Sequence, residues 1–196
     1  MLLTQILLLI TAYLLGSISS AIIVCKLAGL PDPRTSGSNN PGATNVLRIG
    51  GKYAAAGVLL GDAAKGFIPV LIARFLNLDE MTQALVLLSA VIGHLYPIFF
   101  KFQGGKGVAT TLGGLFAFSW ILATLWSATW LIVALIFRYS SLSALVATIL
   151  LPFFAWFVLH NSAVTMILIV LAILVIYRHR SNIQKLIAGH EKKLGQ

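Results

Sequence analysis

Apolar segments about as long as a lipid bilayer is thick recur along this whole chain of 196 residues. A membrane-spanning helix needs about 20 predominantly apolar residues. The composition agrees, since 59% of the residues are hydrophobic and only 10% are charged, against about 25% charged in soluble domains. We therefore expect an all-α polytopic membrane protein, with residues 1–196 forming a single transmembrane domain. Five spans are read directly, at roughly 2–24, 53–75, 81–100, 142–160 and 162–177.

The stretch from Val108 to Phe137 is too long for one ordinary span and carries no charge. As a single helix of roughly 30 residues it would be about 45 Å long, against a hydrocarbon core of about 30 Å. It therefore reads as two short helices joined near Ser119 and Trp120. A long tilted helix or a re-entrant segment also fits the hydropathy.

The distribution of cations favours two crossings in this stretch. The net charge is +9, and the cations flank the apolar segments instead of forming one basic face, so we do not expect a nucleic-acid partner. If 108–137 crosses twice, the cations of the first loop, the third loop, Arg138 and the tail all fall on one side. The positive-inside rule then predicts about seven short transmembrane helices, with the N-terminus outside and the C-terminus in the cytoplasm.

A polar loop, Gly37 to Arg48, reads GSNNPGATNVLR between two apolar segments. Glycine and asparagine tolerate positive φ, and successive N–H groups in such a turn can converge on an anion. Arg48 adds a planar fork that suits phosphate. The alternative is an Asn-Pro turn between helices, with Arg48 serving only as a topology charge. The candidate donors to an anion are Ser38, Asn39, Asn40, Thr44 and Asn45.

A second candidate site is the glycine-rich turn in GHLYPIFFKFQGGKGVATT, residues 93–111. Gly104, Gly105 and Lys106 precede a predicted helix, and a glycine turn at a helix N-terminus is a good phosphate site. The pattern is not a Walker A loop, because Lys106 is followed by Gly107. We interpret His94 as a satisfied histidine that packs between helices.

The tail contributes His179 and Asn182, which are three residues apart and would share one face of a helix. The alternative is an interfacial basic helix. Asp62 and Lys65 lie inside a predicted span, and pairing with each other is the least costly arrangement there.

Several catalytic motifs are not present in the sequence, and this restricts the kinds of reaction to consider. The sequence has no G-x-S-x-G motif, no His followed five positions later by Asp, and no cluster of His, Cys and carboxylates typical of a metal site. We therefore expect no metal and no cofactor. An enzyme without an evident nucleophile or base needs a substrate that is already activated.

Three segments together resemble the motifs of one bacterial family, the integral-membrane glycerol-3-phosphate acyltransferases that use acyl phosphate as donor. They are GSISSA at 16–21, GSNNPGATNVLR at 37–48 and GHLYPIFFKFQGGKGVAT at 93–110, and SSLSA at 140–144 and RHRSNIQKL at 178–186 resemble later segments. The family often has Gly where Asn39 stands. Asparagine is the best substitute for Gly if that position needs a positive φ.

The resemblance implies transfer of a fatty acyl group from acyl phosphate to the sn-1 hydroxyl of glycerol-3-phosphate, giving lysophosphatidic acid and phosphate. It implies a multi-pass protein of the bacterial inner membrane, among membrane lipids, with its active site facing the cytoplasm and no obligate protein partner. A secondary transporter of a small organic phosphate is the alternative. Lys106, Arg48, His179 and Asn182 would be catalytic. Phosphate would be bound by Ser38, Asn39, Asn40, Thr44, Asn45, Gly104, Gly105 and Ser141.

The two-crossing topology can be tested with single cysteines, after the native Cys25 is replaced by alanine. A cysteine in the turn near Ser119 should react with a membrane-impermeant thiol reagent added outside the cell. A cysteine at Gln184, in the tail, should react only after the membrane is opened. Labelling of both positions from the same side would contradict the double crossing.

Overall fold

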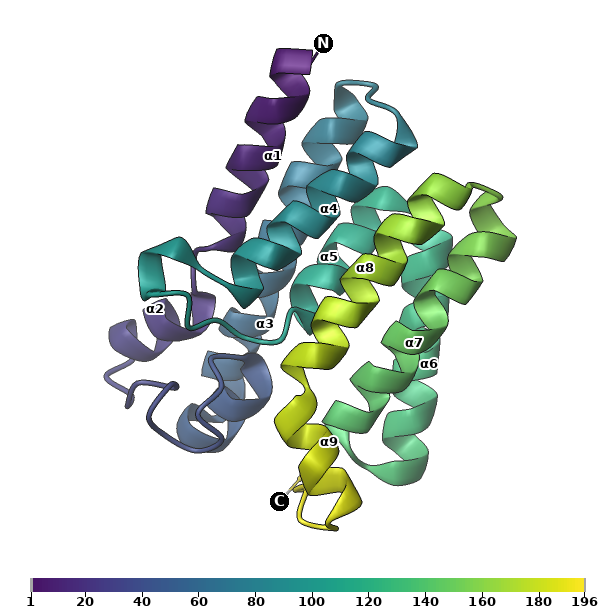
Figure 1. Ribbon diagram of the computed structural model, residues 1–196. Helices are drawn as coiled ribbons and strands as arrows, with labels where there is room; N and C mark the ends of the chain where they lie inside the picture. Colours follow the sequence, from purple (N-terminus) through teal and green to yellow (C-terminus); the bar gives the residue numbers. More distant parts are fainter. Residues whose placement is uncertain (1, 196) are drawn as a thin grey trace. The chain divides into compact units, whose positions relative to one another are not determined.

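The computed structural model describes residues 2–195, and these form α-helices, one short 3-10 helix and connecting loops, with no strand among them (Figure 1). The chain divides into two compact units, Met1–Phe118 and Ser119–Gln196. The first unit contains α1 (Leu2–Gly16), α2 (Ser20–Leu27), α3 (Ala43–Phe75), α4 (Glu80–Leu95), η1 (Ile98–Phe100) and α5 (Val108–Phe118). The second contains α6 (Trp120–Phe137), α7 (Ser140–Leu159), α8 (Ser162–Arg178) and α9 (Arg180–Ile187).

The all-helical membrane architecture is confirmed. Five segments are long and apolar enough to cross a membrane, and the bent pair of α8 and α9, at 59°, makes a sixth. The remaining apolar helix, α5, is shorter than an ordinary span. The orientation and the number of crossings stay predictions. The five segments that are each long and apolar enough to cross a membrane are Leu2–Leu27, Ala43–Phe75, Glu80–Phe100, Trp120–Phe137 and Ser140–Leu159.

The expected break between two helices near Ser119 is confirmed, because α5 ends at Phe118 and α6 begins at Trp120. Ser119 is extended, with φ −152° and ψ 109°, and its hydroxyl caps the new helix by accepting the Leu122 N–H at 3.4 Å. A serine cap satisfies an amide that the start of a helix would otherwise leave without a partner.

Two expected spans differ from continuous helices. The first, 2–24, is interrupted between Gly16 and Ser20, where Ser19 is extended. The fourth helix ends at Leu95 instead of continuing to residue 100, because Tyr96 leaves the helical conformation before Pro97. A residue before proline is disfavoured in the helical region, so this end has a local cause.

Helix α3 is also interrupted, at Gly51. Gly51 has φ 78° and ψ −176°, so a short helix before it is followed by a long one that matches the expected span at 53–75. The short helix carries the end of the 37–48 loop and Arg48. Gly51 is one of the positions where glycine is needed for its positive φ.

Helices α3 and α5 approach closely through a reciprocal pair of glycines. A Cβ on Gly66 would overlap the Thr110 carbonyl, and a Cβ on Gly113 would overlap the Ala63 carbonyl. Helices in lipid associate largely through packing, so small residues let their backbones come close.

Helices α1 and α4 also approach closely through a reciprocal pair of glycines. A Cβ on Gly16 would overlap the Ala90 carbonyl, and a Cβ on Gly93 would overlap the Tyr13 carbonyl. These contacts hold the broken first span and the residues just before His94 in register.

We expect Gly66→Ala to destabilise the protein, because its methyl group overlaps the backbone of α5. Overpacking of this kind costs about 1–3 kcal/mol. Gly57→Ala, in the same helix, places its methyl 3.7 Å from Val24 and is the matched control. It should be neutral or stabilising, since alanine is favoured over glycine in a helix by about 1 kcal/mol. Thermal unfolding in detergent measures both, and equal losses would contradict the close contact.

Candidate functional site

The 37–48 loop is held from inside by the side chain of Asn45. Its Oδ1 accepts the Ser38 N–H at 2.7 Å, and its Nδ2 donates to the carbonyls of Pro33 and Ser36 at 3.0 and 2.9 Å. Asn45 is only 1% exposed. Its amide therefore braces the loop, and we assign it a positioning role in place of direct contact with an anion.

The backbone of the loop takes the conformation that its glycine and asparagine predict. Gly37 has φ 66° and Asn39 has φ 56°, so asparagine occupies a left-handed position as expected. A Cβ on Gly37 would overlap Asn45 Oδ1, which excludes any larger residue. Gly42 is extended and stands before the first turn of α3, where no side chain caps the helix. A helix N-terminus favours an anion.

Most candidate donors of this loop face outwards. Ser38, Asn39 and Thr44 are exposed, and Asn40 is half-buried. Arg48 is exposed on the short helix before Gly51. These side chains are accessible to a ligand, whereas Asn45 is not.

The glycine-rich turn is packed directly on the end of α4. The Gly105 N–H donates to the His94 carbonyl at 3.2 Å. A Cβ on Gly104 would overlap the carbonyls of His94 and Leu95, and a Cβ on Gly105 would overlap the His94 ring. Both glycines are required by close approach. Lys106 is half-buried next to them.

The glycine-rich turn also meets the 37–48 loop. A Cβ on Gly105 would lie 3.0 Å from the Pro41 carbonyl oxygen. The two phosphate-type segments, separated by about sixty residues in the sequence, are therefore neighbours within the first unit.

A buried polar network lies behind this turn. Lys65 and Asp62 form the expected pair at 2.9 Å, and both are buried. Lys65 Nζ also donates to the Ile18 carbonyl at 2.8 Å, and His94 Nδ1 lies 3.6 Å from Asp62 Oδ1. His94 is thus a buried histidine between helices, as interpreted from the sequence, and its carbonyl and ring also shape the glycine turn.

The partner that the broken first span provides to Lys65 was not predicted from the sequence. Ile18 lies in the interruption between α1 and α2, so its carbonyl is available to Lys65. The run of Gly and Ser in GSISSA at membrane depth was the available signal, because such residues interrupt helices where a polar partner is present.

In the second unit, Ser141 and Asn182 are joined by Glu191, which the sequence analysis did not single out. The Ser141 hydroxyl and the Asn182 Nδ2 donate to the same carboxylate oxygen, at 2.5 and 2.7 Å. A lone carboxylate beside Lys192 and Lys193 was the only signal in the sequence.

His179 stands directly before the helix that carries Asn182, and the expectation that the two share a helical face stays a prediction. It lies at the bend between α8 and α9, as the last cap of one helix and the first of the other. Its ring is buried, and Nδ1 is 2.7 Å from the Val175 carbonyl. Hydrophobic periodicity does not report this bend in the backbone.

These residues offer hydrogen-bond donors and cations, with little that would bind a metal. Among residues 2–195, no three or more His, Cys, Asp or Glu side chains gather where they could hold a metal ion. The first unit can position an anion between its loop and its glycine turn, and the second presents two polar side chains oriented by a carboxylate.

Comparison with known proteins gives consistent matches over nearly the whole chain. Residues 6–189 match the family model described as glycerol-3-phosphate acyltransferase. A glycerol-3-phosphate acyltransferase of Francisella tularensis subsp. novicida is 54% identical over 95% of this chain and 91% of its own length. One from Methylococcus capsulatus is 52% identical, over 94% of this chain and 93% of its own length.

A solved structure matches as well. The crystal structure of PlsY (YgiH), an integral membrane glycerol 3-phosphate acyltransferase in its glycerol 3-phosphate form, is 44% identical with a TM-score of 0.93. The match covers 98% of this chain and 96% of that one. A lysophosphatidic acid form of the same protein matches with a TM-score of 0.90.

We expect Asn45→Ala to loosen the loop, because it removes the partner of the Ser38 N–H and of two carbonyls. Leaving such groups unsatisfied should lower the free energy of unfolding by about 1–3 kcal/mol. Limited trypsin cleavage after Arg34 should also become faster. Asn39→Gly is the control, since it preserves the positive φ at an exposed position. Equal behaviour of the two variants would contradict the bracing role.

Proposed function

The chain belongs to the glycerol-3-phosphate acyltransferase family, and on that premise we propose that acyl phosphate is its donor. The enzyme transfers the acyl group to the sn-1 hydroxyl of glycerol-3-phosphate, releasing lysophosphatidic acid and inorganic phosphate. Both substrates then carry a phosphate and both need cationic and N–H donors.

The observation that carries the proposal is the meeting of the 37–48 loop and the glycine turn at Pro41 and Gly105. Two segments that each suit an anion therefore lie side by side, and the absence of a side chain at Gly105 lets the turn pack against the loop. The exposed polar side chains of the loop support binding of a water-soluble phosphate ester.

The roles follow from exposure and charge. We assign phosphate binding to Ser38, Asn39, Asn40 and Thr44 with the backbone of Gly104 and Gly105, and positioning of the loop to Asn45. Arg48 and Lys106 neutralise the charge that develops as phosphate departs. Ser141, His179 and Asn182, which the family resemblance assigns to phosphate, stay predictions, since the His179 ring is buried and Ser141 and Asn182 donate to Glu191.

The transfer needs no covalent acyl-enzyme. The acceptor hydroxyl oxygen bonds to the acyl carbon, the bond from that carbon to the phosphate oxygen breaks, and phosphate leaves with the proton of the hydroxyl. Because phosphate is already a good leaving group, correct positioning of the two substrates and stabilisation of charge supply the catalysis.

The active site faces the cytoplasm of a bacterial inner membrane in this proposal. The loop, the glycine turn and the tail all fall on the cation-rich side of the chain when 108–137 crosses twice. Glycerol-3-phosphate then arrives from the cytoplasm, and the acyl chain stays in the bilayer.

Purified protein should release inorganic phosphate from palmitoyl phosphate only when glycerol-3-phosphate is present. Lysophosphatidic acid should form in equal amount, because one acyl transfer yields one of each product. Equal activity with acyl-CoA or acyl carrier protein thioesters would overturn the donor assignment, while leaving the family intact.

Arg48→Ala and Lys106→Ala should each lower kcat/KM about 100-fold or more, which is typical for loss of one group that stabilises developing charge. Lys52→Ala is the matched control, since Lys52 is an exposed cation four residues after Arg48, on the other side of the break at Gly51. It should stay within about twofold of the unmodified enzyme. Full activity of either test variant in a folded protein would remove that residue from the site.

A further inference from the structure

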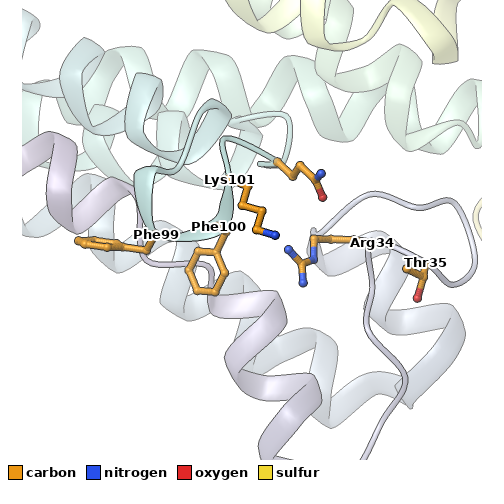
Figure 2. Close-up of a pocket in the computed structure, with 6 residues that line it drawn as sticks. Arg34, Thr35, Phe99, Phe100 and Lys101 are labelled. Carbon is orange, nitrogen blue, oxygen red and sulfur yellow. The ribbon is translucent and has the colours of Figure 1, made fainter.

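A cavity of about 410 Å³ lies in the first unit, lined by none of the residues assigned to the substrates (Figure 2). One wall is the segment that leads into the 37–48 loop, and the other is η1 with the turn that follows it. Its lining residues are Arg34, Thr35, Phe99, Phe100, Lys101 and Gln103.

Two cations face each other across this cavity. Figure 2 shows the Lys101 ammonium and the Arg34 guanidinium pointing toward one another. Arg34 pairs with Asp32 at 2.6 Å, but no carboxylate lies within ion-pair distance of Lys101 in residues 2–195. The pair and Lys101 together leave one positive charge without compensation. Like charges repel at short range, so this arrangement favours an anion between them.

Hydrogen bonds with Arg34 lower the pKa of Asp32 below its usual value, although burial opposes that change. The carboxylate therefore stays charged near neutral pH and fixes the Arg34 guanidinium at the cavity wall. A fixed guanidinium suits a phosphate better than a mobile one, because its fork is already oriented.

The Lys101 side chain is aimed into the cavity by a strained turn. Lys101 and Phe102 have φ 53° and 58°, a left-handed conformation that is costly for both residue types. The N–H groups of Phe100 and Phe102 donate to the Pro97 carbonyl at 3.1 and 2.9 Å, which holds the turn closed. Strain of this kind persists where the surrounding structure enforces it, and it concentrates at binding sites.

The same turn presents apolar surface beside the charges. Phe99 is 60% exposed and Phe102 56%, and Ile98 is also exposed. Aromatic side chains next to cations are typical of the membrane–water interface, where basic pockets bind lipid head groups. The cavity thus combines one net positive charge with neighbouring surface for a hydrocarbon chain.

We propose that this cavity binds the phosphate head of an acyl-chain amphiphile, with Arg34 and Lys101 contacting the phosphate and Phe99 and Phe100 contacting the start of the chain. A membrane phospholipid and a phosphorylated acyl reactant or product share this chemistry. Inorganic phosphate is a poor ligand here, because it has no chain and Asp32 already offsets the charge of Arg34.

Native mass spectrometry of the purified protein in neutral detergent tests the site, with dodecyl phosphate as the probe. Lys101→Gln should weaken binding about tenfold, the effect of losing one hydrogen bond to a charged group. Lys52→Gln, an exposed cation outside the cavity, is the matched control and should bind as the unmodified protein does.

The measurement is repeated in an Arg48→Ala/Lys106→Ala background, where the proposed transfer site is weakened. Lys101→Gln should still reduce dodecyl phosphate binding about tenfold there. No reduction in that background would overturn the cavity site, whatever the fate of the acyl transfer proposal. An equal loss of a neutral alkyl glucoside probe, or inorganic phosphate displacing dodecyl phosphate at equal concentration, would also overturn it.

The source of the ligand is decided by two further probes, offered separately in the same background. Retention of phosphatidylglycerol that depends on Lys101 identifies a membrane lipid. Retention of lysophosphatidic acid that depends on Lys101 identifies the product. Binding of neither probe would overturn the proposal.

Discussion

A lysine ammonium buried among apolar helices sets the arrangement of the first unit. Lys65 is compensated by Asp62 at 2.9 Å and by the Ile18 carbonyl at 2.8 Å. An ion of this kind is tolerated inside a membrane only when partners surround it, and removing one partner of a buried pair is strongly destabilising. The carbonyl is available because the first span is broken, so the break and the ion depend on each other. Reciprocal glycine contacts then hold α1 on α4 and α3 on α5 around this network.

The network reaches the candidate site through His94. Its ring lies 3.6 Å from Asp62, its carbonyl accepts the Gly105 N–H, and a side chain at Gly105 would overlap the ring. Gly105 in turn lies against Pro41 of the loop. The position of the glycine turn therefore depends on buried helix contacts as well as on its own sequence. This explains how a loop of small and polar residues keeps one conformation at the edge of an apolar bundle.

Hydropathy and length were enough to predict the helical class, the break at Ser119 and the Asp62–Lys65 pair, because these depend on local composition and on the cost of charge in lipid. The positive φ of Asn39 also followed from residue type. The interruption at Ser17–Ser19 was not predicted, since tertiary structure brings the Lys65 ammonium to the carbonyl of Ile18. The bend at His179 was not predicted either, because hydrophobic periodicity does not report a backbone bend. Asn45 was expected to contact an anion, but its neighbours in the fold occupy both ends of its amide. Glu191 lies in a basic tail in the sequence, and only the fold shows that its carboxylate accepts hydrogen bonds from Ser141 and Asn182.

The proposed chemistry depends on an acyl donor that already carries a good leaving group. The candidate site supplies hydrogen-bond donors and cations. In this proposal the acyl group passes directly from phosphate to the acceptor hydroxyl. Exchange of radiolabelled inorganic phosphate into palmitoyl phosphate tests this most directly, when purified enzyme is incubated without glycerol-3-phosphate. Direct transfer predicts no incorporation of label, because the acyl–phosphate bond breaks only when the acceptor attacks. Incorporation catalysed by the enzyme would show an acyl-enzyme intermediate and contradict the account.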